Sequence, residues 1–438
     1  MRNVQLISML TVILVLASAA SAVQINTLTA EEREAGFVQL FDGKTLTGWD
    51  GNPKFWSVVD GAIVGRTTPD NPTKGNTFLI WRQGLLCDFE LRLSWKIEGG
   101  NSGVQYRSRD EGKWVVGGYQ ADIDANNRYT GILYEERGRG IMVKRGEKVE
   151  RNPGKSVVVG KISSDAAVAE AVNRDGWNDY VITARGNTLT QTLNGVPTMM
   201  LSDNEKAKAA DCGVLALQLH AGPPMTVRFR SIRLKRFAPE GGESLFDGHT
   251  LTGWKRHDGL PGHGGVAGKW YVEDGAIVGI QDPPGKGGFL TTFRTFKDFE
   301  FECETQVDWP FDSGIFLRVG PHGKSHQVTI DYRDGGDIGG IYCPWTQNFV
   351  HRCPEGIEHF KKGAWNHFKI SCRGEPARIK VWINNTQVTD FQHTAASTQG
   401  IPPEGTLCLQ VHPGGEGYDQ SKARFRKLRI RELPSGTK

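Results

Sequence analysis

Residues 88–98 read DFELRLSWKIE, and the spacing of their apolar side chains indicates the fold class. Every second position from Phe89 to Ile97 is apolar, and the positions between them are polar. Because successive side chains of a β-strand point to opposite faces of a sheet, this alternation predicts a strand with one face in a hydrophobic core. The first three residues recur at 298–300 as DFE, so the same predicted strand occurs twice.

The repeat extends well beyond this strand. The sequence LFDGKTLTGW at 40–49 recurs at 245–254 as LFDGHTLTGW, and DGAIVG occurs at both 60–65 and 274–279. Further matches keep the same order along the chain and end with LQLH at 217–220 and LQVH at 409–412. Ordered matches over this length indicate a duplicated domain rather than a short solenoid repeat. Because period-2 stretches alternate with Gly and Asn-Gly turn signals, we expect two antiparallel β-sandwiches.

The composition agrees with an all-β fold. Glycine contributes 55 of 438 residues, close to twice the usual share of about 7%. Helix is expected only at a capping box over 29–32 and in a short segment over 164–172, which is present in the first copy alone. A net charge of +4, spread along the chain, argues against a nucleic-acid partner, which requires a clustered basic face.

The chain begins with a cationic start, a short apolar run and Ala20-Ser21-Ala22. These features predict a Sec signal peptide over 1–22, cleavage after Ala22 and a secreted or periplasmic protein. An apolar run of about 12 residues is too short to span a membrane as a helix, so we expect no stable membrane span after cleavage. The expected domains are 23–238 and 243–438, joined by a linker over 239–242.

Seven cysteines leave at least one thiol unpaired in an exported chain. Cys343 and Cys353 flank a short loop and are the expected disulfide. The spacing of the cysteines and histidines does not indicate a structural zinc site.

Several predicted strands carry polar side chains on the face away from the core. In YQADID at 119–124, for example, Tyr119 and Ile123 face the core, so the polar positions project together to the other side. The polar set of the first copy is Gln105, Arg107, Gln120, Asp122, Asp124, Gln218 and His220, and that of the second is Arg318, Gln327, Thr329, Asp331, Gln410 and His412. Such a face indicates a ligand-binding cleft, with a structural hydrogen-bond network as the alternative.

The repeated LFDGKTLTGW, DGAIVG, Asn-Ser-Gly and Leu-Gln-Leu-His stretches resemble the 3-keto-disaccharide hydrolase domain family over nearly the whole mature chain. The resemblance implies two tandem concanavalin A-like jelly-roll β-sandwiches. It also implies a carbohydrate ligand and cleavage of 3-keto-glycosides. One departure matters: Gln120 and Gln327 stand where the family often has Glu, and Asp122 stands where it usually has Gln. A general acid therefore cannot be transferred to either glutamine, and Asp122 is the candidate catalytic carboxylate that could replace it.

A 3-keto group acidifies the C2 hydrogen, so a base can remove that proton and the C1 substituent can leave. Water then adds to the product. We expect His220 or His412 as the base, because histidine titrates near neutrality, and Arg107 or Arg318 as the stabiliser of negative charge. Asp124 or Asp331 could orient the histidine, act as an acid or bind a divalent metal such as Ca²⁺. The expected sugar-binding residues are Gln120, Gln218, Tyr134 and Glu135 in the first copy, and Gln327, Gln410, Asp331, Arg318 and His412 in the second.

Two other functions fit the same residues. The first is a non-catalytic carbohydrate-binding module, which the glutamine-for-glutamate departure favours. The second is a laminarinase-type glycoside hydrolase, which would need carboxylates at alternate positions of one strand; Asp122 and Asp124 meet part of that requirement. Because the first copy has two acidic residues on this strand and the second has only Asp331, we expect the first copy to be catalytic and the second to bind glycan.

Overall fold

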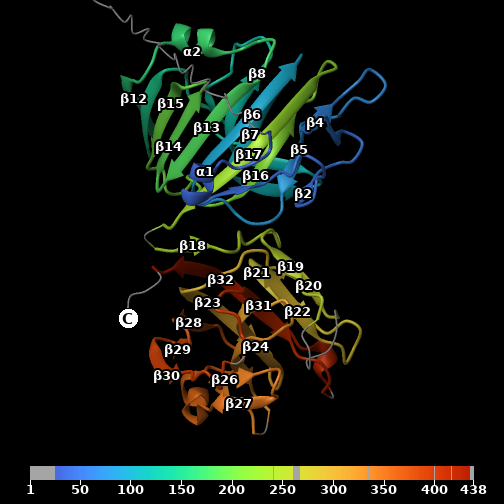
Figure 1. Ribbon diagram of the computed structural model, residues 1–438, viewed down its shortest axis with the longest axis vertical. Helices are drawn as coiled ribbons and strands as arrows, with labels where there is room; N and C mark the ends of the chain where they lie inside the picture. The colour runs from blue at the N-terminus through green and yellow to red at the C-terminus, as the bar shows by residue number, and fades with distance from the viewer. Residues whose placement is uncertain are drawn as a thin grey trace, which may run out of the picture.

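The computed structural model describes residues 25–239, 241–259, 267–333, 335–398, 400–415 and 417–434. The expected signal peptide and Glu240 of the expected linker lie outside the described residues. The described chain is almost entirely β-structure, which confirms the all-β prediction (Figure 1). Strands β1–β17 and strands β18–β32 form separate sheets, one set above the other in Figure 1. We call residues 25–239 the first half and residues 241–434 the second half.

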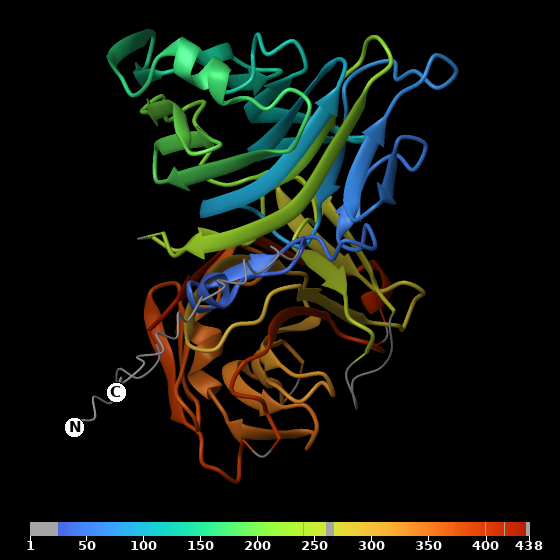
Figure 2. The same cartoon turned by 45° about the horizontal axis from the view of Figure 1, so that its top comes forward.

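The first half is built from a ten-stranded and a seven-stranded sheet. The larger sheet has the order β12 (Lys155–Lys161), β11 (Glu147–Asn152), β15 (Val196–Asp203), β14 (Thr188–Leu193), β13 (Asn178–Arg185), β6 (Asp88–Glu98), β17 (Thr226–Phe237), β4 (Ala62–Arg66) and β3 (Trp56–Val59), with β1 (Phe37–Gln39) paired to β17. The smaller sheet has the order β10 (Gly140–Val143), β9 (Leu133–Glu136), β8 (Val115–Asp124), β7 (Asn101–Gly112), β16 (Val214–Leu219), β5 (Thr77–Trp81) and β2 (Trp49–Asp50). Figure 2 shows β6 (light blue) and β17 (yellow-green) side by side, as their antiparallel pairing requires.

The second half has an eight-stranded and a seven-stranded sheet. The larger sheet has the order β20 (Lys269–Glu273), β21 (Ala276–Ile280), β32 (Ala423–Glu432), β23 (Phe299–Val307), β28 (Asn366–Arg373), β29 (Arg378–Ile383) and β30 (Thr386–Gln392), with β18 (Glu243–Ser244) paired to β32. The smaller sheet has the order β19 (Trp254–Arg256), β22 (Gly288–Thr292), β31 (Thr406–Val411), β24 (Asp312–Val319), β25 (His326–Asp331), β26 (Ile338–Cys343) and β27 (Asn348–His351).

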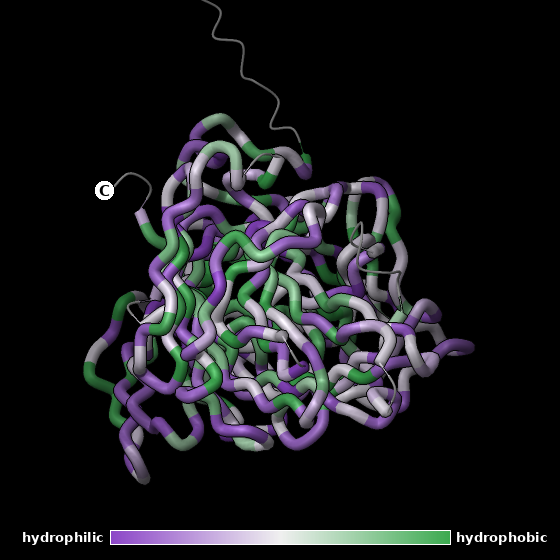
Figure 3. The backbone as a smooth tube through the Cα atoms, turned by 90° about the horizontal axis from the view of Figure 1, so that it is seen from below, coloured by the Kyte–Doolittle hydropathy of each residue, from purple (hydrophilic) through white to green (hydrophobic). Residues whose placement is uncertain are grey.

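The alternating residues of β6 form part of the core between the two sheets of the first half. Phe89, Leu91, Leu93, Trp95 and Ile97 are all buried there, together with the inward residues of β8 and β16. The second half has its own large core cluster. Apolar segments run through the middle of the molecule, and polar segments are frequent at its periphery (Figure 3). Each pair of sheets therefore encloses a separate core.

Helices are few. The predicted capping box is confirmed at α1 (Ala30–Glu34), where the Thr29 side chain accepts a hydrogen bond from the Glu32 amide and the Glu32 carboxylate accepts one from the Thr29 amide. Helix α2 (Asp165–Ala171) begins after the N-cap Ser164, also as predicted. Two 3₁₀ segments, η1 (Pro354–His359) and η2 (Tyr418–Gln420), complete the set. No helix in the described part of the chain is long and apolar enough to cross a membrane.

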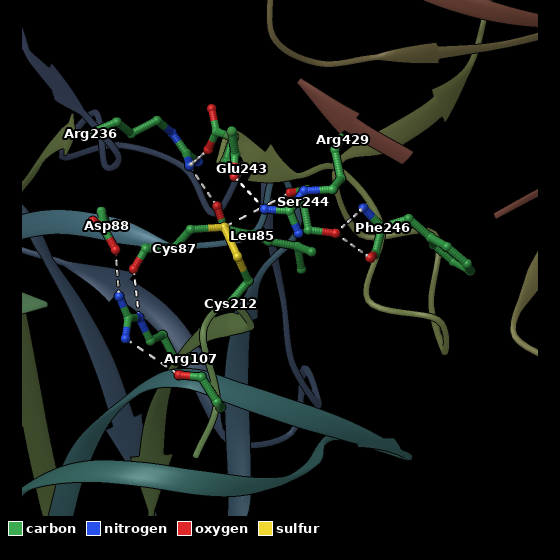
Figure 4. The surroundings of a disulfide bond; sticks show 12 residues. Leu85, Cys87, Asp88, Arg107, Cys212, Arg236, Glu243, Ser244, Phe246 and Arg429 are labelled. Atoms are coloured by element: carbon green, nitrogen blue, oxygen red, sulfur yellow. Dashed lines mark hydrogen bonds and ion pairs between the residues drawn. A yellow bond between two sulfur atoms is a disulfide. The ribbon is translucent and has the colours of Figure 1, made fainter. Parts of the chain in front are cut away.

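The expected disulfide between Cys343 and Cys353 is wrong, because both of these thiols are free and buried. The disulfide joins Cys87 and Cys212, which lie 125 positions apart in the sequence (Figure 4). An isolated β-bridge between Leu86 and Gly213 brings the two cysteines together. Such a long-range pairing cannot be inferred from the length of a loop.

A polar junction joins the two halves. The Glu243 carboxylate forms ion pairs with Arg236 of the first half and Arg294 of the second, and Arg294 also pairs with Glu432 at 2.6 Å. The backbone amide of Gly253 donates to the carbonyl of Arg82 across the same junction, at 2.9 Å. These contacts fix the two sandwiches to each other without a shared hydrophobic core.

Candidate functional site

A cavity of about 670 Å³ lies against the outer face of the seven-stranded sheet in the first half. We call it the first cavity. Its floor comes from β8, β9, β10 and β16, and its rim from the loops at their ends. The lining residues with polar side chains are Asn76, Asn101, Gln120, Asp122, Asp124, Asn126, Arg128, Tyr129, Tyr134, Glu136, Gln218 and His220.

The alternation of β8 decides which of its side chains reach this cavity. Tyr119, Ala121 and Ile123 are buried in the core. Gln120, Asp122 and Asp124 therefore point to the opposite face, and all three line the first cavity.

Asp122 is the most strongly perturbed acid of this cavity. Its carboxylate is buried and accepts hydrogen bonds from Gln120 Nε2 at 2.7 Å and from Asn101 Nδ2 at 3.4 Å. Burial, with smaller contributions from the charges of Asp124 and Glu136, raises the pKa of Asp122 to about 7. A carboxyl group with this pKa can both hold and release a proton near neutral pH.

Amide side chains extend from Asp122 along the floor of the cavity. The amides of Gln105 and Gln120 lie 2.9 Å apart, and both side chains are buried. Gln218 Nε2 donates to Glu136 Oε2 at 3.3 Å, and Glu136 Oε1 accepts from Asn76 at 3.2 Å. The glutamines at positions 120 and 218 are thus held by the carboxylates of Asp122 and Glu136.

His220 lies at the edge of the same cavity. Its Nδ1 atom is hydrogen-bonded to the carbonyl oxygen of Ala221. Because a carbonyl oxygen only accepts hydrogen bonds, this contact assigns the proton to Nδ1. The neutral ring then carries its basic lone pair on Nε2, which is the arrangement that a general base requires.

Asp124 lines the cavity but mainly stabilises a turn. Its carboxylate accepts hydrogen bonds from the backbone amides of Asn126, Arg128 and Tyr129, at 3.0, 2.9 and 3.2 Å. This turn places the Arg128 side chain, which is exposed, on the rim of the cavity.

The structure does not place Arg107 with the other predicted residues. Arg107 has a positive φ of 46°, within an irregularity of the β7–β8 pairing. Its buried guanidinium donates to the carbonyls of Cys87 and Gly186 and pairs with Asp88 at 2.7 Å (Figure 4). Ser108 occupies the place next to Gln105 instead, with its hydroxyl 2.6 Å from the Gln105 amide. The irregular backbone breaks the two-residue period, so the predicted position of Arg107 on the cavity face is wrong.

Arg318 of the second half deviates in the same way. Its φ is 50°, and its buried guanidinium pairs with Asp298 at 3.0 Å and donates to the carbonyls of Lys297 and Gly374. Arg107 is not in the lining of the first cavity, and Arg318 is not in the lining of the cavity on the smaller sheet of the second half.

Glu135 also lies outside the first cavity. On β9, Tyr134 and Glu136 face the cavity, whereas Glu135 is buried on the other side in an ion pair with Arg139 at 2.6 Å. Since adjacent residues of a strand cannot share a face, Tyr134 and Glu135 could not both be rim residues. The alternation beginning at Tyr134 is the signal that points to Glu136.

A second cavity of about 360 Å³ lies on the smaller sheet of the second half. It includes the predicted residues Gln327, Asp331, Gln410 and His412, together with Asp312, Thr329, Arg333, Tyr342 and Phe349. Asp312 is buried and lies 3.3 Å from His412 Nε2 and 2.7 Å from Arg333. Burial and the charge of Asp331 raise the pKa of Asp312, although Arg333 opposes this shift.

Several residues that line the two cavities were not predicted from the sequence as site residues. They include Asn76, Arg128, Glu136, Asp312 and Arg333. The Asn-Ser-Gly repeat could have identified Asp312, because Asp312-Ser313-Gly314 aligns with Asn101-Ser102-Gly103. Arg128 and Arg333 lie in turns after the cavity strands, where strand parity gives no guidance.

Asp124 and Asp331 were the expected ligands of a divalent metal. Among the described residues, no three His, Cys, Asp or Glu side chains converge as a metal-binding group. Asp124 accepts three backbone hydrogen bonds, and Asp331 is paired with Arg333 at 2.8 Å. These residues do not fit a calcium site, so no step below runs through a metal.

Buried amide and carboxyl side chains thus line a cavity on the smaller sheet of each half. The family described as the 3-keto-alpha-glucoside-1,2-lyase-like domain matches residues 36–235 and 241–431. The chain therefore belongs to this family, as its sequence motifs predicted, and both halves take part in the match.

One curated relative is named a 3-keto-disaccharide hydrolase and comes from Bacteroides thetaiotaomicron. It is 35% identical over 104 residues, which cover 23% of this chain and 32% of that protein. The alignment thus spans about a third of the relative.

Among solved structures, a candidate glycosyl hydrolase from Parabacteroides distasonis ATCC 8503 is 22% identical, with a TM-score of 0.33 over 44% of this chain and 95% of that one. The carbohydrate-binding module CBM66 from Bacillus subtilis is 16% identical, with a TM-score of 0.31 over 41% of this chain and 96% of that one.

Proposed function

We propose that the first cavity cleaves 3-keto-glycosides by elimination across C1 and C2 of the sugar. In this proposal His220 is the general base, Asp122 the general acid and Arg128 the cation that stabilises the enolate. The observation that carries the proposal is the buried Asp122 carboxyl, with a pKa of about 7, in the same cavity as His220. Elimination requires an acid and a base in one site.

The reaction begins at C2, whose hydrogen the neighbouring ketone makes acidic. His220 Nε2 takes this proton, and the C–H electron pair becomes an enolate with its charge on the C3 oxygen. Arg128 lies on the rim and stabilises that charge. The electrons then return to form the C1–C2 double bond while the C1–O bond breaks. Asp122 gives its proton to the departing oxygen, and water later adds to the 2-hydroxy-3-keto-glucal to give the 3-keto sugar.

Membership of the lyase-like family supports this chemistry, and the Bacteroides relative supports the substrate class. The second half has a threonine, Thr329, at the position equivalent to Asp122. The strand pairing gives this equivalence, because Thr329 lies across from Gly314 as Asp122 lies across from Gly103. The first cavity is therefore the better candidate for turnover. A threonine at this position cannot supply the acid. His412 is moreover paired with Asp312.

The leaving group provides the test. We would compare Asp122→Asn and His220→Ala on a 4-nitrophenyl 3-keto-glucoside and on a 3-keto-disaccharide. A nitrophenolate leaves without protonation, so Asp122→Asn should lower kcat/KM by about 10²–10⁴-fold on the disaccharide and far less on the nitrophenyl substrate. His220→Ala should lower kcat/KM strongly on both, because C2 deprotonation is common to them.

The matched control is His412→Ala in the second half, which should have a small effect. A larger loss from His412→Ala than from His220→Ala would assign turnover to the second cavity. Mass spectrometry of the products distinguishes the other functions. No product from any 3-keto substrate would favour a binding module, and cleavage of an unoxidised β-glucan would favour a glucanase.

We also propose that the protein acts outside the cytoplasm. The predicted signal peptide motivates this, and the Cys87–Cys212 disulfide supports it, because structural disulfides persist in oxidising compartments. N-terminal sequencing of the protein from its native host should begin at Val23. An intact Met1 in the mature protein would contradict the proposal.

A further inference from the structure

The two cavities use an equivalent pair of buried glutamines in different ways. In the first cavity, Gln120 Nε2 donates to Asp122 at 2.7 Å and to Gln218 Oε1 at 3.5 Å, and Gln218 Nε2 donates to Glu136. In the second cavity, Gln327 Nε2 donates to Gln410 Oε1 at 3.1 Å. Beyond this bond, Gln410 Nε2 and Gln327 Oε1 have no hydrogen-bond partner among the described residues.

The strand register explains the difference. Gln120 pairs with Gln105 across β7–β8, whereas Gln327 pairs with the apolar Phe316 across β24–β25. Thr329 takes the place of Asp122, and its hydroxyl donates to Asp337 at 3.3 Å. The second half thus lacks the groups that satisfy the glutamines of the first.

Both glutamines are more than nine-tenths buried and lie in the lining of the second cavity. A buried amide group without a hydrogen-bond partner lowers the stability of the fold, so such groups are rare in native structures. Here the unused groups are one donor and one acceptor. A sugar hydroxyl, which both donates and accepts, matches this pair.

The rest of the cavity indicates which kind of molecule fits. Tyr342 and Phe349 form an edge-to-face pair with ring centroids 5.1 Å apart, and both line the cavity. The Arg333 guanidinium is already paired with Asp312 and Asp331, at 2.7 and 2.8 Å. The cavity therefore combines an aromatic wall, neutral amides and internally paired charges.

We propose that the second cavity is a separate binding site for a neutral hexopyranose. Gln410 Nε2 donates to a sugar hydroxyl, Gln327 Oε1 accepts from one, and Tyr342 and Phe349 pack against the apolar face of the ring. Binding here requires no keto group, so the site is independent of the turnover proposed for the first cavity.

The test is calorimetric titration of the full chain with cellobiose, maltose and trehalose, none of which carries a keto group. At least one of these should bind, and Gln410→Met should weaken that binding by about 5–10-fold or more. Gln218→Met, the matched change in the first cavity, should leave it in place. Phe349→Ala tests the aromatic wall separately, and thermal unfolding of each variant shows whether it is folded.

Three results would overturn the proposed site, and a fourth would overturn its neutral ligand class. They are no binding of any of the three sugars at millimolar concentration, binding that survives both Gln410→Met and Phe349→Ala, and binding that only Gln218→Met removes. Tighter binding of glucuronic acid than of glucose would contradict the neutral class. The calorimetric test measures heat of binding, whereas the elimination assay measures product. A negative result for sugar binding therefore does not contradict the proposed elimination, and a negative elimination assay does not contradict the proposed binding site.

Discussion

Asp122 shows how the surroundings of one residue change its pKa. The side chain is held by Gln120 and Asn101, but these hydrogen bonds do not offset the cost of burying its charge. Its folded-state pKa of about 7 lies above the ordinary value of 3.8. The folded protein therefore binds a proton that the unfolded chain has lost between these two pH values.

Asp122→Asn should increase stability at neutral and alkaline pH. Because its folded-state pKa is raised, the contribution of Asp122 to stability is greatest below pH 4 and is lost as the pH rises through about 7. Asparagine carries no charge, so the variant should gain on the order of 2–4 kcal/mol at pH 8 and little at pH 4. Denaturant unfolding at both pH values measures this difference. An equal or lower stability of Asp122→Asn at pH 8 would show that the carboxyl is not destabilised by burial.

The activity of the wild type should follow the same titration. If Asp122 must carry a proton to act as the acid, kcat/KM on a 3-keto-disaccharide should fall as the pH rises above about 7. The nitrophenyl substrate should lack this alkaline decline, because its leaving group needs no proton. A decline of equal size on both substrates would remove Asp122 from the role of acid.

At the level of the strand, the alternation of apolar and polar residues predicts which side chains face the core. The prediction fails where the backbone of a strand is irregular. The period of two in 119–124 correctly separates Gln120 and Asp122 from the core. The same rule fails at Arg107 and Arg318, where both strands adopt a positive φ. These backbones lie against Gly213 and Gly405, where an added Cβ would lie 2.3–2.4 Å from the arginine carbonyl carbon. A bulge is a property of two paired strands, so one strand read alone does not reveal it.

Arg107 should prove structural rather than catalytic. Arg107→Met removes the guanidinium that donates to the Cys87 and Gly186 carbonyls and pairs with Asp88, whose carboxylate then keeps the Gly186 amide as a donor. We expect a loss of about 3–5 kcal/mol in unfolding free energy, typical of a broken buried ion pair. The folded fraction should keep kcat within about threefold of wild type, far from the effect of removing a catalytic group. A loss of 100-fold in kcat with unchanged stability would restore the catalytic role, and Arg318→Met is the matched variant in the second half.

For the whole molecule, the sequence repeat predicts two β-sandwiches but not the contacts that join the two halves. The ordered motifs correctly give an all-β chain with two short helices. The disulfide and the ion pairs between the halves could not be predicted from the sequence. Neither Cys87–Cys212 nor the Arg236–Glu243–Arg294 cluster follows a local sequence pattern. The expected Cys343–Cys353 pair fails for the same reason.

The disulfide has a consequence for how the chain withstands proteases. It closes a loop that contains β12, an exposed edge strand bounded by Lys155 and Lys161. A tryptic cut there breaks the backbone but leaves both pieces covalently joined. Limited digestion should therefore give one full-length band on a denaturing gel without reductant, and two fragments once reductant is added. A cut at the exposed Lys361 or Lys362 of the second half should release separate fragments under both conditions, because the five cysteines of that half are free.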